Sequence, residues 1–136
     1  MMQVSSAFVA DPELTQELER RSKPISLGSD RVLFHQGDAP SGVYILRKGA
    51  ATLTRRFDDE AILSVQVGAG SLLGLPGVIG SKPYSLTAEA MEGAEVSLVT
   101  REDFVDLMQT EPLLSFQVLK VLAEEVRFAR ESLSHP

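Results

Sequence analysis

The sequence predicts a mainly β fold: a double-stranded β-helix jelly roll (a β-roll) of about eight strands, with a short helix before it and two helices after it. Three observations support this prediction. Short apolar runs, many of them β-branched, alternate with glycine-containing turns between residues 25 and 100. A helix-start signal precedes them, and a stretch without Gly or Pro follows at 113–133. Because 136 residues suit one domain, we expect a single domain over 1–136.

The first element expected is a helix over residues 12–22. Asp11 can cap its start, and Pro12 suits the first helical position because that residue needs no amide partner. Leu14 and Leu18 lie four residues apart, on one face of the helix. These signals predict a short amphipathic helix.

The β-roll is expected over residues 25–100. Several of its apolar runs alternate with polar residues in period two, as at 64–67. Turn signals rich in Gly, Pro and Asp separate the runs, as at 37–40. The expected strands cover residues 25–27, 31–35, 43–48, 50–57, 62–67, 71–73, 85–90 and 95–100.

Two helices are expected after the β-roll, over 101–109 and 111–133. Thr100 followed by Asp103 resembles a capping box, and Pro112 marks the second start. The second helix is the longer one, and no Gly or Pro interrupts it before its end.

The long helix carries a seam of apolar residues at spacings of three and four, which is typical of a coiled coil. The seam consists of Leu119, Leu122, Val126, Ala129 and Leu133. It favours a homodimer formed through this helix, and the alternative is that the same stripe packs on its own β-roll. Val118, Val121 and Phe128 lie beside it, so the apolar face is wide enough for both contacts.

Two glycine-punctuated segments carry the strongest motif in the chain. The first, at 33–49, reads Leu-Phe-His-Gln-Gly-Asp and then Val-Tyr-Ile-Leu-Arg-Lys-Gly. The second, at 70–87, reads Gly-Ser-Leu-Leu-Gly-Leu-Pro-Gly-Val and then Tyr-Ser-Leu-Thr. Together they resemble the cyclic nucleotide-binding domain of the Crp/Fnr (catabolite activator) regulators, protein kinase A regulatory subunits and gated channels. The resemblance covers about residues 8–133 and implies a ligand-sensing β-roll.

In that family the second segment is a phosphate-binding cassette. Its short helix points backbone amides at the cyclic phosphate, a Glu after the Gly binds the ribose, and an Arg some ten residues later pairs with the phosphate. Here Gly74 is present, but Leu75 stands at the Glu position and Tyr84 at the Arg position. Lys82 is a point charge and cannot reproduce the guanidinium fork. The resemblance therefore implies a degenerate cassette.

The pocket residues expected from this resemblance surround the cassette and the start of the following strand. They are Leu73, Gly74, Leu75, Pro76, Gly77, Val78, Lys82, Tyr84, Ser85 and Leu86. A ligand held there would bias how the helix over 111–133 packs.

Three functions follow as hypotheses. The first is a non-enzymatic regulatory sensor domain of the Crp/Fnr type that does not bind cyclic AMP in the usual way and takes an unknown small molecule. The second is a ligand-free structural or dimerisation module that recruits a protein partner. The third is a true cyclic nucleotide-binding signalling protein, since backbone amides alone can contact a phosphate. No other cofactor is expected.

Composition argues against several other classes. With no cysteine, this chain forms no disulfide, thiolate nucleophile or iron–sulfur site, and its two histidines have no metal-site spacing, which also disfavours a cupin-type enzyme. Glu124 and Glu125 point in different directions on a helix, so they form no catalytic pair. The net charge of −6, without a basic stripe, disfavours direct DNA binding.

Features that the sequence lacks lead to expectations about cellular location and about a DNA-binding domain. No apolar run is long enough to span a membrane and no secretory signal is visible, so a cytoplasmic location is expected. Members of the family that bind DNA carry a winged helix-turn-helix after the long helix, and none fits before Pro136.

Overall fold

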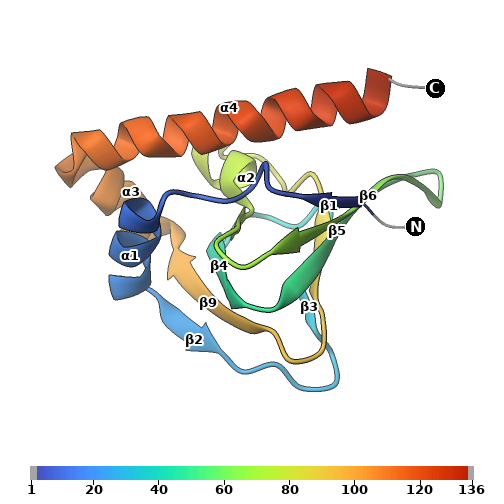
Figure 1. Ribbon diagram of the computed structural model, residues 1–136, viewed down its shortest axis with the longest axis horizontal. Helices are drawn as coiled ribbons and strands as arrows, with labels where there is room; N and C mark the ends of the chain where they lie inside the picture. Colours follow the sequence, from blue (N-terminus) through green and yellow to red (C-terminus); the bar gives the residue numbers. More distant parts are fainter. Residues whose placement is uncertain (1–2, 135–136) are drawn as a thin grey trace.

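The computed structural model describes the backbone of residues 3–134 and the side chains of residues 5–131. Within that range, nine strands form two sheets that face each other in a β-roll, and four helices cover one end of it (Figure 1). The strands are β1 (Gln3–Ser5), β2 (Lys23–Ile25), β3 (Val32–Phe34), β4 (Gly42–Lys48), β5 (Ala50–Phe57), β6 (Glu60–Gly68), β7 (Leu72–Leu73), β8 (Thr87–Ala90) and β9 (Glu95–Thr100). The helices are α1 (Pro12–Arg20), α2 (Leu75–Gly80), α3 (Arg101–Thr110) and α4 (Pro112–Ser134).

One sheet has five strands in the order β1-β6-β5-β8-β3, and the other has four in the order β2-β9-β4-β7. Period-two alternation fixes the register of the larger sheet. Leu53 of β5 lies opposite Val65 of β6 on one side and Ala88 of β8 on the other, and all three side chains are buried. Their shared inward face is one wall of the β-roll.

Strand β4 is buried on both of its faces, and neighbouring residues contribute to different cores. Tyr44 and Leu46 point into the interior of the β-roll, whereas Val43 and Ile45 point outward beneath the helices. We call these the barrel core and the helical core. The jelly-roll prediction is therefore confirmed, with a second hydrophobic core between the four-stranded sheet and the helices.

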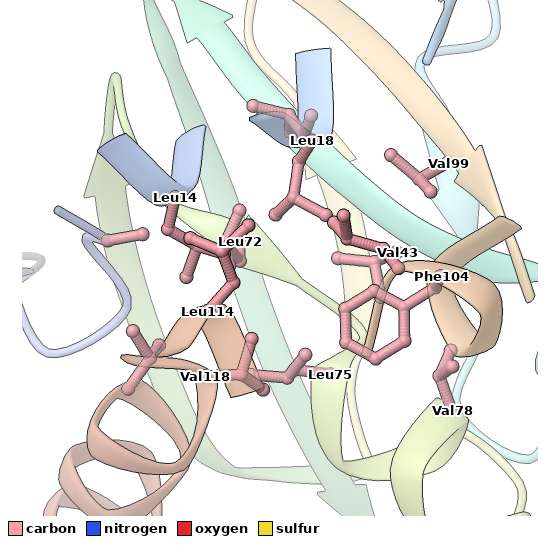
Figure 2. Close-up of a cluster of buried hydrophobic side chains, with 14 residues drawn as sticks. Leu14, Leu18, Val43, Leu72, Leu75, Val78, Val99, Phe104, Leu114 and Val118 are labelled. Atoms are coloured by element: carbon pink, nitrogen blue, oxygen red, sulfur yellow. The ribbon is translucent and has the colours of Figure 1, made fainter. Parts of the chain in front are cut away.

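The helical core is assembled from all four helices and three strands (Figure 2). Leu14 and Leu18 of α1 are fully buried in it, so the face predicted from their spacing is the face that packs. Its other main members are Val43, Ile45, Leu72, Leu75, Val78, Val99, Phe104, Leu107, Leu114, Val118 and Val121.

Differences from the expected elements have local causes. The helix expected over 12–22 ends at Arg20, since the Arg21 amide turns back to the Leu18 carbonyl at 3.1 Å. The strand expected at 25–27 lies at Lys23–Ile25, where it pairs antiparallel with β9. The remaining strands begin or end within a few residues of expectation, and β5 and β9 have the expected bounds.

Two further elements were not expected from residue patterns. Strand β1 pairs in parallel with β6 over three residues. Helix α2 occupies the cassette, where the family resemblance implied a short helix.

At the β4–β5 turn, Gly49 has φ of 82°, and a Cβ there would come 2.9 Å from the Ala94 Cα atom, so the turn needs glycine. No helix in the described residues is long and apolar enough to cross a membrane.

Candidate ligand pocket

The pocket lies where α4 and α2 cover the end of the β-roll, and it consists of two adjoining hollows. The inner hollow reaches toward the barrel core and has a volume of about 30 Å³. The outer hollow lies between the β5–β6 hairpin and α4 and has a volume of about 170 Å³. Both are lined by Phe8, Pro76, Ser85, Leu86 and Glu125.

Tyr84 forms the floor of the inner hollow and is firmly held. Its ring stacks on Phe34 with the centroids 3.9 Å apart. Its hydroxyl accepts hydrogen bonds from the amides of Ser41 at 3.0 Å and Gly42 at 3.1 Å, and donates to the Gly42 carbonyl at 2.7 Å. These contacts use the donor and both acceptor sites of the phenol. The Tyr84 side chain is therefore a built-in part of the β-roll.

The cassette glycines close over the Tyr84 ring. Gly74 has φ of 89°, and a Cβ there would lie 2.7 Å from Tyr84 Cε1. A Cβ on Gly77 would lie 3.2 Å from Tyr84 Cδ1. The two glycines thus let the cassette backbone pack directly on the aromatic ring, which fills the space beneath it.

The remaining sequence-predicted residues divide between the pocket and other surroundings. Ser85 and Leu86 line both hollows, and Leu73 lines the inner one. Leu75 and Val78, also expected in the pocket, turn into the helical core beside Phe104 (Figure 2), because α2 packs that face against α3 and α4.

Lys82 was expected as the nearest cation, but it is exposed and belongs to the lining of neither hollow. Among the described lining residues of the two hollows, Arg55 on β5 is the only cation, and it lines the outer hollow.

Glu125 on α4 is the only acidic residue in the described lining of the two hollows. Only 5% of its surface is exposed, and its Oε1 atom has no hydrogen-bond partner. Burial raises the pKa of this carboxyl well above the usual range for glutamate. The pocket therefore contains a buried acid on α4, whereas the family resemblance implies a basic group at the position that Tyr84 occupies.

The spacing of apolar residues along α4 is the sequence signal that places Glu125 on the packed face of this helix. The face of α4 that packs on the rest of the molecule follows spacings of four and three: Leu114, Val118, Val121, Glu125 and Phe128. Glu125 stands in register with these apolar residues, so an acid occupies a position that the helix turns inward. Phe128 packs edge-on against Phe8 at 5.8 Å and closes the pocket beside it.

The side of α4 next to its packed face is largely uncovered, and its residues Val126 and Ala129 also line the edge of the outer hollow. Leu119 is 57% exposed and Val126 is 50% exposed, while Leu122 and Ala129 are half-buried. The side chain of Leu133 lies outside the described residues. Phe116, one turn before Leu119, is also exposed. The predicted seam thus runs along the boundary of the packed face and continues onto the free one.

No group of three or more His, Cys, Asp and Glu side chains in the described part of the chain is arranged to hold a metal ion. The polar chemistry of the pocket comes instead from Glu125, Arg55 and Ser85.

Comparisons with known proteins agree with this architecture. Residues 24–111 match the family model described as cyclic nucleotide-binding domain. The transcriptional activator protein FnrA of Stutzerimonas stutzeri is 29% identical over 124 residues, covering 90% of this chain and 49% of that protein. The fumarate and nitrate reduction regulatory protein of Vibrio cholerae is 31% identical over 124 residues, covering 89% of this chain and 47% of that protein. The chain thus spans about half the length of these curated relatives.

Among solved structures, the Thermus thermophilus catabolite activator protein superposes with a TM-score of 0.74 at 24% identity. The match covers 90% of this chain and 58% of that one. At this sequence identity, the structural similarity shows a shared fold and nothing further.

Proposed function

Because the chain belongs to the cyclic nucleotide-binding domain family, we propose that it is a non-enzymatic regulatory sensor domain of the Crp/Fnr type that does not bind cyclic AMP in the usual way. The observation that carries this proposal is Tyr84. It stands at the position of the family's phosphate-binding Arg, and its ring fills the space between the cassette glycines and Phe34.

Space supports the proposal. Pockets for drug-sized ligands have volumes of roughly 300–1,000 Å³, whereas the hollow beneath the cassette has about 30 Å³. A cyclic phosphate could enter only if Tyr84 left its place. That movement would break one aromatic stack and three hydrogen bonds, at a cost on the order of 2–6 kcal/mol.

Charge supports it as well. A cyclic phosphate carries a negative charge, and in this family an Arg neutralises it. The inner hollow has no cation in its described lining, and Glu125 faces it instead. An anionic ligand would therefore lose its hydration in the inner hollow without gaining an ion pair, which would oppose binding.

The pocket is placed to influence α4. Pro76 belongs to α2, Leu86 precedes β8, and Glu125 belongs to α4, so a molecule in the outer hollow would touch three separate segments. A ligand that fits one packing of α4 better than another would shift the population of the two. This is the signalling mechanism that we propose.

The output surface that we propose is the free side of α4, which would form a homodimer. Phe116, Leu119 and Val126 are each at least half exposed, which is unusual for three apolar residues on one helix. Pairing two such helices would bury them as a coiled-coil-like seam.

The test is a thermal-shift titration with cyclic AMP and cyclic GMP, each up to millimolar concentration. A known cyclic AMP receptor domain in the same plate is the positive control. We expect no saturable rise in melting temperature for this chain. A saturable, nucleotide-specific rise would overturn the proposal and favour the alternative of a true cyclic nucleotide-binding signalling protein.

A second candidate, a ligand-free module that recruits a protein through α4, is favoured by one observation. The hollow beneath the cassette is already occupied by the chain's own aromatic side chains. This candidate differs from the first in the outer hollow, which it leaves without a function.

A further inference from the structure

We propose that the outer hollow binds a small, single-ring molecule that carries a cationic, N–H-donating group, and that the Glu125 carboxyl is the group that recognises it. This inference rests on the proposed function, because it names the ligand class of the same sensor pocket. An amidine or amino group on an aromatic ring has the required chemistry.

The first argument is the state of Glu125. Buried polar atoms in folded proteins almost always have hydrogen-bond partners, and an exception calls for an explanation. Oε1 of Glu125 has none, although the side chain is 95% removed from solvent. A ligand that donates N–H groups would complete this site.

The second argument is that the described residues supply no partner for the Oε1 atom of Glu125. Arg55 lines the same outer hollow, yet it makes no hydrogen bond with the Oε1 atom of Glu125. The neighbouring Glu124, by contrast, is exposed and pairs with Arg127 at 2.5 Å. Of these two neighbouring carboxyls, the exposed Glu124 thus has an ion-pair partner, whereas Oε1 of Glu125, the residue that lines the pocket, has no hydrogen-bond partner.

The third argument concerns the walls and the size. The outer hollow is bounded mainly by apolar side chains, among them Phe8, Leu63, Leu86 and Phe128. Its volume of about 170 Å³ is close to that of apolar cavities known to take one benzene ring, about 150 Å³. An aromatic ring would fill these walls, while the carboxyl would orient its polar group.

The sign of the charge then sets the ligand apart from a nucleotide. A carboxylate in an apolar site pairs best with a cation that can donate hydrogen bonds, and amidinium groups do so in a bidentate manner. A cation would lower the pKa of Glu125 again and pair with the resulting carboxylate, whereas an anionic molecule of the same size would keep the carboxyl protonated and form no ion pair with it. Recognition by Glu125 therefore favours a positively charged ring compound over an anionic one.

The experiment uses benzamidine as the cationic probe and benzoate as its anionic counterpart of equal size. Binding is followed by amide chemical-shift changes in ¹H–¹⁵N spectra of the wild-type chain, the E125Q variant and the matched control E124Q. We expect saturable benzamidine binding that shifts amides of α4 and α2, weakened about tenfold or more by E125Q and less than twofold by E124Q. Benzoate should bind at least tenfold more weakly than benzamidine.

Each other outcome counts against the inference. If benzamidine does not bind to the wild-type chain, binds equally well to E125Q, or is matched by benzoate, Glu125 is not the recognition group. The E125Q spectrum without ligand shows whether that variant is folded. Cyclic AMP titrated in the same series separates the two proposals. Saturable binding of cyclic AMP overturns the proposed function. If neither cyclic AMP nor benzamidine binds, only this inference is overturned.

Discussion

The helical core and the barrel core share the strand β4 but differ in how completely they are filled. In the helical core, Phe104, Leu107 and Leu75 are buried among other apolar side chains, with no charged member. The barrel core is equally apolar at its centre, but toward α4 it opens into two hollows beside Glu125. The closed core stabilises the fold, and the open one contains the hollows in which we propose that a ligand binds. The comparison predicts that mutations in the two regions will change the free energy of unfolding by different amounts and in opposite directions.

The largest effect is expected from truncation in the closed core. Phe104→Ala should lower the free energy of unfolding by about 3–5 kcal/mol, since Phe104 is 2% exposed and its neighbours cannot fill the space. Urea unfolding followed by circular dichroism measures this change. Val105→Ala on the same helix, at a site 41% exposed, is the control and should change stability by less than about 1 kcal/mol. Similar losses in both variants would contradict the account of the helical core.

A smaller loss is expected at the border between filled and hollow space. Tyr84→Phe keeps the ring stack but leaves the buried Gly42 amide without the hydroxyl that accepts its hydrogen bond. The expected loss is about 2 kcal/mol, measured in the same unfolding assay. Thermal titration of this variant with cyclic AMP should still show no binding, because the ring stays in place. An unchanged stability would mean that the hydroxyl contacts contribute little.

At the open end, the sign should reverse. Glu125→Leu removes a buried, unpaired carboxyl from apolar surroundings and should raise the free energy of unfolding by about 1 kcal/mol at neutral pH. Glu124→Gln, at an exposed position, should have no comparable effect. A destabilised Glu125→Leu chain would show that the carboxyl has a structural role that its surroundings do not reveal.

The same residue should make stability depend on pH. Burial raises the pKa of Glu125 in the folded chain above its unfolded value near 4.5. Above that pH the folded chain binds more protons than the unfolded chain, so the free energy of unfolding falls as pH rises until the folded carboxyl ionises. Urea unfolding at a series of pH values should show this decline in the wild type. The decline should be weaker in Glu125→Leu, and identical slopes would exclude Glu125 as its source.

The smallest change in monomer stability is expected on the free side of α4. Leu119→Glu and Val126→Glu alter exposed positions and should change the free energy of unfolding by less than about 0.5 kcal/mol. Both should nevertheless abolish self-association, because two facing seams would then carry like charges. Sedimentation velocity of each variant, with Gln109→Glu on α3 as the control, measures this. Dimers that survive both substitutions would place the interface elsewhere.

The closed parts of the molecule were also the parts that the sequence predicted best. Strands β5 and β9 have the expected bounds because their residues alternate between an inward and an outward face. The inward face of α1 followed from two leucines four residues apart. In each case, the apolar residues selected by the periodicity of the sequence are the residues that the structure buries.

The open end was predicted less well, for reasons that are physical. Strand β1 is three residues long and joins β6 through backbone hydrogen bonds, so side-chain patterns carry little trace of it. Helix α2 holds a Pro and two Gly in six residues, and its short turn directs Leu75 and Val78 away from the pocket. Glu125 has helical spacing that matches the packed face of α4, but residue type alone argued against burial.

Strand β4 has a consequence for how such a domain can change over time. Alternate residues along it, such as Ile45, pack in the helical core. The residues between them, such as Tyr44, pack in the barrel core, which opens into the two hollows. The two sets of side chains interleave along the strand, yet each belongs to its own neighbourhood. A chain built in this way can exchange one binding chemistry for another while its framework stays intact. A substitution in one set of side chains can therefore leave the packing of the other set in place.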